Sequence, residues 1–387
     1  MIFLKRRALM TRASFNYKTV NGIESITLEN CVETRFKRLE LLGNSAQGEN
    51  PSIESPKEIK NSGKYDEVSG KYVIDVSVTG KNLINVDELR NENGKIDSVF
   101  TKARDISNFD VIKDRKYLLI SKGTMLIDVS YSAIYFGKDD LKYLTNHNDI
   151  LSTGTGYKLF TGKEMRIVLT AKETCTITKV IIHGNAEKTD AYIAEELGLF
   201  EISDNDINID YETYRKPQTI QLQLDEPLRG IGEYKDVITK DGIVRKIGHL
   251  EIKGGLIWND WGKQFRIIVS VEKAAILYSK YLCNYTNDVK NFGNQHFIYL
   301  YFTKEQIEAI GINANDTLEV ANKRLNEIVA NKPIVIEYPL KTPIFEPFPQ
   351  ETQLALENLH ANDGTTIVSV DSGEVETGIE VEYAVKE

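Results

Sequence analysis

The feature that most constrains this chain is an alternation of apolar and polar residues with a period of two. Residues 74–78 read Ile-Asp-Val-Ser-Val, and the same pattern recurs at 125–131, 220–224 and 379–383. A period of two places alternate side chains on opposite faces of a pleated strand, so each segment predicts a strand with one buried face. Strands and helices do not alternate regularly along the chain. We therefore expect a mainly β protein built of antiparallel, jelly-roll-like β-sandwich domains.

Denser apolar runs predict strands that are buried on both faces. They lie at residues 166–170, 265–271, 297–302 and 334–338. Such runs are typical of sandwich interiors, where neither face of the strand meets water.

Helix is expected only in a short segment near residues 303–331. Thr303 and Gln306 form the pattern of a capping box, and Gly311 ends that first helix. A second helix is expected to start near Asp316, to bury the stripe Leu318, Ala321, Leu325 and Ile328, and to end before Pro333.

Length and turn-rich stretches predict three units. The chain has 387 residues, and a domain commonly has about 150. Residues 1–64 are expected to form an N-terminal hairpin and an extended arm, residues 65–215 a first β-sandwich, and residues 216–387 a second β-rich domain with short helices. The boundaries follow the turn-rich stretches at 43–64 and 203–217.

Charge and hydropathy exclude some classes of partner. The formal net charge is −9, which argues against nucleic acid, because phosphate binding needs clustered Lys and Arg. No apolar run of 18 residues is present, and no apolar region long enough for a signal peptide follows Lys5, Arg6 and Arg7. We expect no membrane span and no standard export signal.

The patterns of common catalytic and metal sites are missing or incomplete. Cys31, Cys175 and Cys283 have no disulfide or zinc spacing and are expected to be small buried residues. The stretch 156–163 lacks the residues of a Walker motif, and 204–215 lacks the glycine and the final acid of a calcium loop. We expect no catalytic residue, no cofactor and no metal. Paired carboxylates for glycoside cleavage stay open, because their separation is a three-dimensional property.

Aromatic residues supply the remaining candidates for ligand binding. Trp258 and Trp261 lie in a predicted turn, and Tyr131 and Tyr135 lie in the segment SYSAIYFG. Each pair has two interpretations, a platform on which a sugar ring stacks or a part of the sandwich core or edge, and the second is favoured for both.

Several phrases of the chain resemble, in the same order, tail and baseplate proteins of phages of Gram-positive bacteria, including prophages and phage-like particles. Those phrases are LELLGNSAQGENPSIESPKEI from residue 39, KNLINVDEL from 81, IDYETYRKPQTIQLQLDEPLRGIGEYKDVI from 209, GIVRKIGHLEI from 242, WNDW from 258, KPIVIEYPLKTPIFEPF from 332 and DGTTIVSVDSGEVETGIEVEYAVK from 363. The phrases mark turns and strand ends, so the resemblance implies a place in an assembly and identifies no catalytic residue.

The resemblance implies a virion structural protein of a tail tip or baseplate that takes part in receptor binding and host attachment. KNLINVDEL is similar to the opening strand of a jelly-roll domain like a carbohydrate-binding module, and the stretch 43–64 is expected to be an arm that can dock on a neighbouring subunit. Implied partners are other tail or baseplate proteins, further copies of the chain in a homotrimer, and host cell-wall polysaccharide. Two alternatives stay open, a carbohydrate-binding adhesin module and a tail-associated hydrolase of cell-wall polysaccharide.

Overall fold

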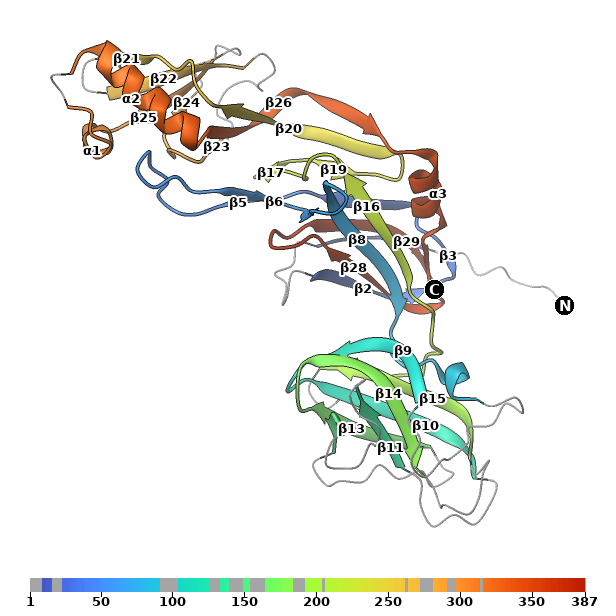
Figure 1. Ribbon diagram of the computed structural model, residues 1–387. Coiled ribbons are helices and arrows are strands. Elements are labelled where there is room, and N and C mark those ends of the chain that lie inside the picture. Colours follow the sequence, from blue (N-terminus) through green and yellow to red (C-terminus); the bar gives the residue numbers. More distant parts are fainter. Residues whose placement is uncertain are drawn as a thin grey trace.

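The protein consists of three β-rich parts that follow one another in space (Figure 1). The computed structural model describes residues 9–15, 23–90, 104–125, 133–138, 149–153, 164–183, 192–203, 206–261, 264–271, 281–290, 297–313 and 316–386. A central part lies between a second part, formed within residues 82–216, and a third part, formed mainly within residues 250–340. All described strand pairs are antiparallel, which confirms the predicted mainly β, antiparallel fold class.

One twelve-stranded sheet dominates the central part. Its strands are β1 (Leu9–Phe15), β2 (Ile23–Cys31), β4 (Arg38–Leu42), β7 (Lys64–Asp66), β8 (Lys71–Gly80), β16 (Gln218–Leu224), β19 (Val237–Ile238), β20 (Gly242–Ile252), β23 (Leu282–Cys283), β26 (Ile334–Pro347), β28 (Gly364–Asp371) and β29 (Gly378–Val385). The main path runs β16-β8-β28-β2-β29-β4-β19-β20-β26-β23, with β1 paired to β29 and β7 paired to β8. Segments from both ends of the sequence thus share one hydrogen-bonded sheet.

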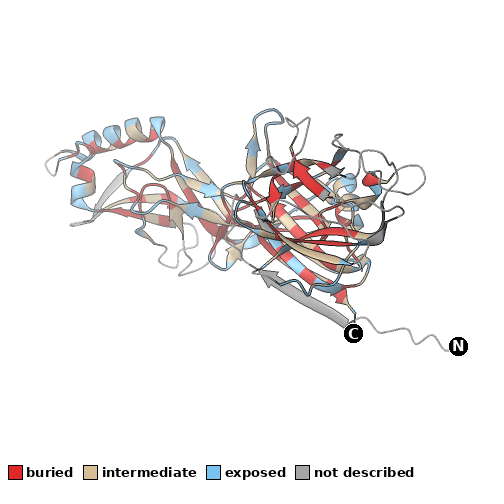
Figure 2. Cartoon of the chain, turned by 90° about the horizontal axis from the view of Figure 1, so that it is seen from below, coloured by how far each residue is buried: buried red, intermediate tan, exposed pale blue. Residues whose placement is uncertain are grey.

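The central core lies on the inner face of this sheet, as the alternation predicts. Ile74, Val76 and Val78 of β8 are buried together with Ile379 and Val381 of β29. Figure 2 shows buried residues alternating with exposed ones along the strands. Helix α3 (Gln350–Asn358), which the sequence did not predict, adds Leu356 to the same core.

The predicted separate unit at residues 1–64 is not what the structure shows. Strands β2 and β4 pair with β28 and β29 near the other end of the chain, so residue 64 lies inside the central part. Such long-range pairing has no local sequence signal. Short two-stranded sheets complete the central part, formed by β3 (Thr34–Arg35) with β27 (His360–Ala361) and by β17 (Gly230–Ile231) with β18 (Tyr234–Lys235).

The second part is a β-sandwich of one four-stranded and one three-stranded sheet. The first sheet contains β12 (Leu151–Ser152), β13 (Met165–Ala171), β10 (Lys116–Met125) and β15 (Tyr192–Ile202), and the second contains β11 (Ala133–Gly137), β14 (Cys175–His183) and β9 (Arg104–Val111). Their apolar side chains share one core. KNLINVDEL does not form the expected opening strand, because it ends in the 3₁₀ helix η1 (Val86–Leu89), which Asn85 caps.

The third part packs two helices against a four-stranded sheet and the adjoining ends of β20 and β26. The sheet contains β21 (Trp258–Trp261), β22 (Gln264–Ser270), β25 (Phe297–Phe302) and β24 (Val289–Lys290). The helices are α1 (Lys304–Glu308) and α2 (Leu318–Asn331), which confirms the predicted helical segment, and the capping box of Thr303 and Gln306 is present. The predicted stripe of α2 is partly wrong: Leu318 is 52% exposed, and Val329 is buried instead.

The turn-rich stretch after residue 43 forms a hairpin that contacts its own chain. Strands β5 (Ser45–Gln47) and β6 (Ile59–Asn61) pair with each other, and the hairpin points from the central part toward the third part (Figure 1). Ile53, in the loop between them, is buried in the core of the third part. Gln47 Nε2 donates to the carbonyl oxygen of Cys283 at 2.7 Å. The expected arm is therefore docked within the chain.

Candidate functional site

A buried carboxylate, Glu337, lies where the central and third parts meet. It belongs to β26 and is 0% exposed. Its carboxylate accepts hydrogen bonds from Ser45 Oγ at 2.9 Å and from Asn61 Nδ2 at 2.7 Å. Arg229 Nε lies 3.3 Å and His249 Nδ1 lies 3.6 Å from Glu337 Oε1. Because a buried charge is tolerated only when it is paired and hydrogen-bonded, these four neighbours make an acid acceptable here. We call the five residues the Glu337 node.

The node brings together phrases that lie far apart in the sequence. Ser45 comes from the phrase starting at residue 39, Arg229 from the one at 209, His249 from the one at 242 and Glu337 from the one at 332. The phrase from residue 363 lies next to the node: Asn44, which precedes Ser45, donates through Nδ2 to the carbonyl oxygen of Glu376 at 2.6 Å. Residues from five of the seven phrases thus meet at this joint, whereas, among the described residues, KNLINVDEL and WNDW contribute none.

Two glycines allow the backbone to close tightly beside the node. A Cβ on Gly230 would overlap the carbonyl oxygen of Gly43, and a Cβ on Gly43 would lie 2.7 Å from Leu228 Cβ. Gly230 N donates to Ser45 Oγ at 3.1 Å across this contact. Only residues without a side chain fit, which explains the glycines of LLGNS and LRGIG.

A second buried carboxylate, Asp236, holds the neighbouring turn. It accepts backbone N–H groups from Arg229 at 3.1 Å, Lys246 at 2.7 Å and Ile247 at 3.0 Å, and Arg245 Nη1 lies 3.3 Å away. Burial raises the pKa of Asp236 above its usual range, while the backbone hydrogen bonds and Arg245 act in the opposite direction. Asp236 therefore ties the segment of Arg229 to β20, the strand that carries His249 of the node.

A groove adjoins the Glu337 node and runs from the joint of the central and third parts along the central part. It consists of two adjoining hollows of about 530 Å³ each, which share walls formed by Glu58, Ile59, Asn61, Tyr72 and Pro227. One hollow extends toward the third part and is also lined by Lys57, Arg229, His249, Glu251, Asn284, Asn331 and Lys332. The other continues to Lys60, Lys64, Tyr65 and Glu374. We call the whole the junction groove.

The aromatic end of the junction groove is formed by a cross-strand pair. Tyr65 of β7 lies opposite Tyr72 of β8, and the two rings meet edge to face with centroids 5.3 Å apart. Tyr65 is 60% exposed. An exposed ring held by a neighbouring ring can accept an apolar face of a ligand with little loss of side-chain freedom.

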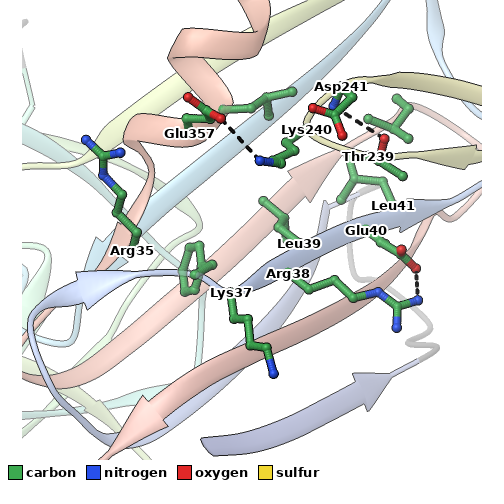
Figure 3. Close-up of a pocket in the computed structure, with 13 residues that line it drawn as sticks. Arg35, Lys37, Arg38, Leu39, Glu40, Leu41, Thr239, Lys240, Asp241 and Glu357 are labelled. Atoms are coloured by element: carbon green, nitrogen blue, oxygen red, sulfur yellow. Dashed lines mark hydrogen bonds and ion pairs between the residues drawn. The ribbon is translucent and has the colours of Figure 1, made fainter. Parts of the chain in front are cut away.

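A separate pocket of about 380 Å³ lies where β4 and β19 diverge. The two strands pair only at Leu41 with Ile238 and at Leu42 with Val237, and the end of α3 closes the gap beyond (Figure 3). Apolar side chains line part of this pocket, including Leu39, Leu41, Ile238 and Leu356. A cavity of this kind could accept an apolar side chain of another molecule.

Charged groups around this pocket largely neutralise one another. Lys240 Nζ lies 3.2 Å from Glu357 Oε1, and Arg38 is paired with Glu40 (Figure 3). Lys37 Nζ lies 2.8 Å from Glu382 Oε1. The pocket therefore offers less unpaired charge than the junction groove.

Of the four aromatic candidates from the sequence, only Tyr135 has a side chain among the described residues. Tyr135 is 6% exposed in β11, and this burial argues against its role as a sugar platform. Tyr131 lies outside the described residues. Trp258 and Trp261 are the first and last residues of β21, where the backbone alone is described.

Sequence reasoning missed the Glu337 node, although one signal was present. Glu337 is the single acid in the apolar run 334–338, which predicts a strand buried on both faces. An acid at such a position must have buried partners. Which residues those are could not be read from the sequence, because they come from strands up to 292 positions away.

The cysteines and the acidic segment after β15 offer no reactive cluster in the described chain. Burial raises the pKa of Cys31 and of Cys283 to about 11, so both thiols stay protonated at neutral pH. Asp206 and Asp210 are exposed. Within the described residues, no group of three His, Cys, Asp or Glu side chains is placed to hold a metal ion. None of the described helices is both long and apolar enough to cross a membrane.

Comparisons with protein-family models, with curated proteins and with solved structures find no match to this chain.

Proposed function

We propose that the protein is a structural component of the tail tip or baseplate of a phage, or of a phage-tail-like particle, of Gram-positive bacteria, and that it takes part in attachment to the host surface. The observation that carries the proposal is the convergence of five of the seven tail-like phrases on the Glu337 node and its glycine contact. A resemblance confined to turns could arise in unrelated proteins. Phrases that together build one joint between two parts support the proposal more than isolated turns would.

An open sheet edge supports a role in assembly. The second half of β26, at residues 341–347, pairs with β20 on one side, and no described strand pairs with its other side. Ile344 and Phe345 are exposed there. Subunit packing is one way to cover such an edge, and Pro343 and Pro347 limit open-ended strand addition. We propose a homotrimer in the virion as the assembled form, together with other tail proteins.

Binding without catalysis is part of the proposal. The buried carboxylates Glu337 and Asp236 are engaged by hydrogen bonds from the chain itself, which suits a structural role. Incubation with host wall glycan should release no reducing ends. Steady release that a single carboxylate substitution abolishes would instead identify a tail-associated hydrolase.

Light scattering on the purified protein at micromolar concentration tests the assembly. We expect an oligomer, and Phe345→Asp should shift it toward monomer because a charge replaces an exposed apolar contact. Leu354→Asp is the matched control, since Leu354 is similarly exposed on α3. A monomeric wild-type protein, or equal effects of both substitutions, contradicts assembly through this edge.

A further inference from the structure

One end of the junction groove carries two lysines that have no ion-pair partner among the described residues, although the whole chain has a formal charge of −9. Lys57 and Lys332 line this end, and neither takes part in an ion pair with a described residue. Arg229 also lines this end, but Glu226 and Glu337 balance its charge. Of the two acids on the same walls, Glu58 and Glu251, the second is already paired with Lys253 at 3.3 Å. This end therefore favours an anion.

Arg229, on the floor of this hollow, adds a third cationic side chain to it. Its side chain is 5% exposed and lines the cationic hollow. Arg229 Nη1 donates to Glu226 at 2.8 Å, and Arg229 Nε is ion-paired with Glu337 at 3.3 Å. A guanidinium has five N–H donors, so Arg229 can pair with these two acids and still donate to an acceptor in the groove.

The other features of the groove suit a sugar chain. Tyr65 and Tyr72 offer a ring at one end, and Asn331 on the wall of the other hollow donates through Nδ2 to the carbonyl oxygen of Glu327, which leaves its amide oxygen for a ligand hydroxyl. Stacking on an aromatic face together with planar hydrogen-bonding groups is how a protein can recognise a hydroxyl-rich ring.

An acidic peptide fits less well, because the backbone along the groove is already paired. Lys57 N donates to the carbonyl oxygen of Asn284 at 2.9 Å, and Ser62 exchanges two backbone hydrogen bonds with Leu228. Extended peptides commonly bind by adding a strand to a free edge. The groove walls present mainly side chains instead.

We propose that the junction groove binds a glycan that carries anionic groups, either carboxylates or phosphodiesters. A sugar ring packs on Tyr65 and Tyr72, and an anionic group lies near Lys57, Lys332 and Arg229. This inference rests on the host-attachment role proposed above and names the ligand class and the place.

Titration calorimetry on the full chain, with four probes of equal length, tests the ligand class. The probes are an oligogalacturonate, a sugar-phosphate oligomer joined by phosphodiesters, a neutral gluco-oligosaccharide and an oligoglutamate peptide. We expect one of the two anionic sugars to bind at least about tenfold more tightly than the others and to weaken with added salt. The tighter of the two identifies the anionic group. Equal binding of the neutral sugar, tighter binding of the peptide, or no binding of any probe overturns the inference.

Paired variants test the place. Tyr65→Ala should weaken binding about two- to tenfold through lost stacking, whereas Tyr65→Phe keeps the ring and the affinity.

Lys57→Gln combined with Lys332→Gln should weaken glycan binding about tenfold and flatten its salt dependence, while the corresponding Arg variants retain the binding. Lys304→Gln, remote on α1, is the control. Unchanged binding in the Gln and Ala variants contradicts this location.

Light scattering on the same samples separates the two proposals. Intact oligomers with no glycan binding overturn the groove inference alone. Monomers that still bind the anionic sugar overturn the tail-assembly proposal and leave the groove as the site of a free binding protein.

Discussion

The two outer parts of the molecule are joined to the central part in different ways. The third part shares β20 and β26 with the central sheet, receives the β5–β6 hairpin and contains the Glu337 node at the joint. The second part is reached after Gly80 and left before Gln218, so only two chain crossings connect it (Figure 1). Strands that run through both parts make the hydrogen-bonded sheet and the packed core continuous across the joint. We therefore expect the third part to unfold together with the centre and the second part to open on its own.

Glu337→Ala should have the largest effect, because it removes the acid at the joint between the central and third parts. The substitution removes the ion-pair partner of the buried Arg229 and the acceptor of Ser45 Oγ and Asn61 Nδ2. The free energy of unfolding should therefore fall by about 3–5 kcal/mol. Denaturant titration measures it. Glu251→Ala, on the neighbouring strand β20 and partly exposed, should cost less than about 0.5–1 kcal/mol. Similar costs for both substitutions would show that the node does not stabilise this joint.

Gly230→Ala tests the tight backbone contact beside the node. The new Cβ overlaps the carbonyl oxygen of Gly43, so the backbone has to shift, at a cost of about 1–3 kcal/mol. Gly254→Ala is the control, because its Cβ would lie 3.6 Å from Asn326 Oδ1, an ordinary contact. Thermal unfolding should lower Tm clearly for the first variant and little for the second. An unshifted Tm for Gly230→Ala contradicts close packing here.

Asn82→Ala sharpens the comparison from the side of the second part. Asn82 is 2% exposed, accepts hydrogen bonds from Ile84 N at 3.0 Å and Leu199 N at 3.1 Å, and donates to the carbonyl oxygen of Glu212 at 3.1 Å. Its loss should cost about 1–3 kcal/mol. Hydrogen exchange should rise in the second part and stay unchanged in β20 and β26. An equal rise in β26 would show that the two outer parts are coupled.

The smallest effect is expected at the second crossing, where Glu212 contacts the central part. Its carboxylate accepts Thr365 N at 2.9 Å and Thr365 Oγ1 at 2.6 Å. Glu212→Gln should cost about 0.5–1.5 kcal/mol and speed limited proteolysis within residues 206–217. A double-mutant cycle with Thr365→Val measures the coupling of the two side chains. Zero coupling means that this contact does not hold the crossing.

The strands were predictable because their signal is local. Residues 74–78 and 379–383 alternate with a period of two, and Thr303 and Gln306 form a capping box that needs no distant partner. Helix α3 was missed because Pro349 provides no side-chain cap. Leu318 was placed wrongly, since the helix period fixes which residues share a face but not which face meets the core.

By itself, the sequence determined the fold class, the helical segment and the polar character of the turns, because each depends on side chains a few positions apart. Only the tertiary structure decided that both chain ends build one sheet, that the hairpin after residue 43 docks within its own chain, and that Glu337 meets Arg229 and Ser45. Pairing between strands hundreds of residues apart depends on shape and on the mutual satisfaction of buried polar groups. Neither property belongs to any one segment.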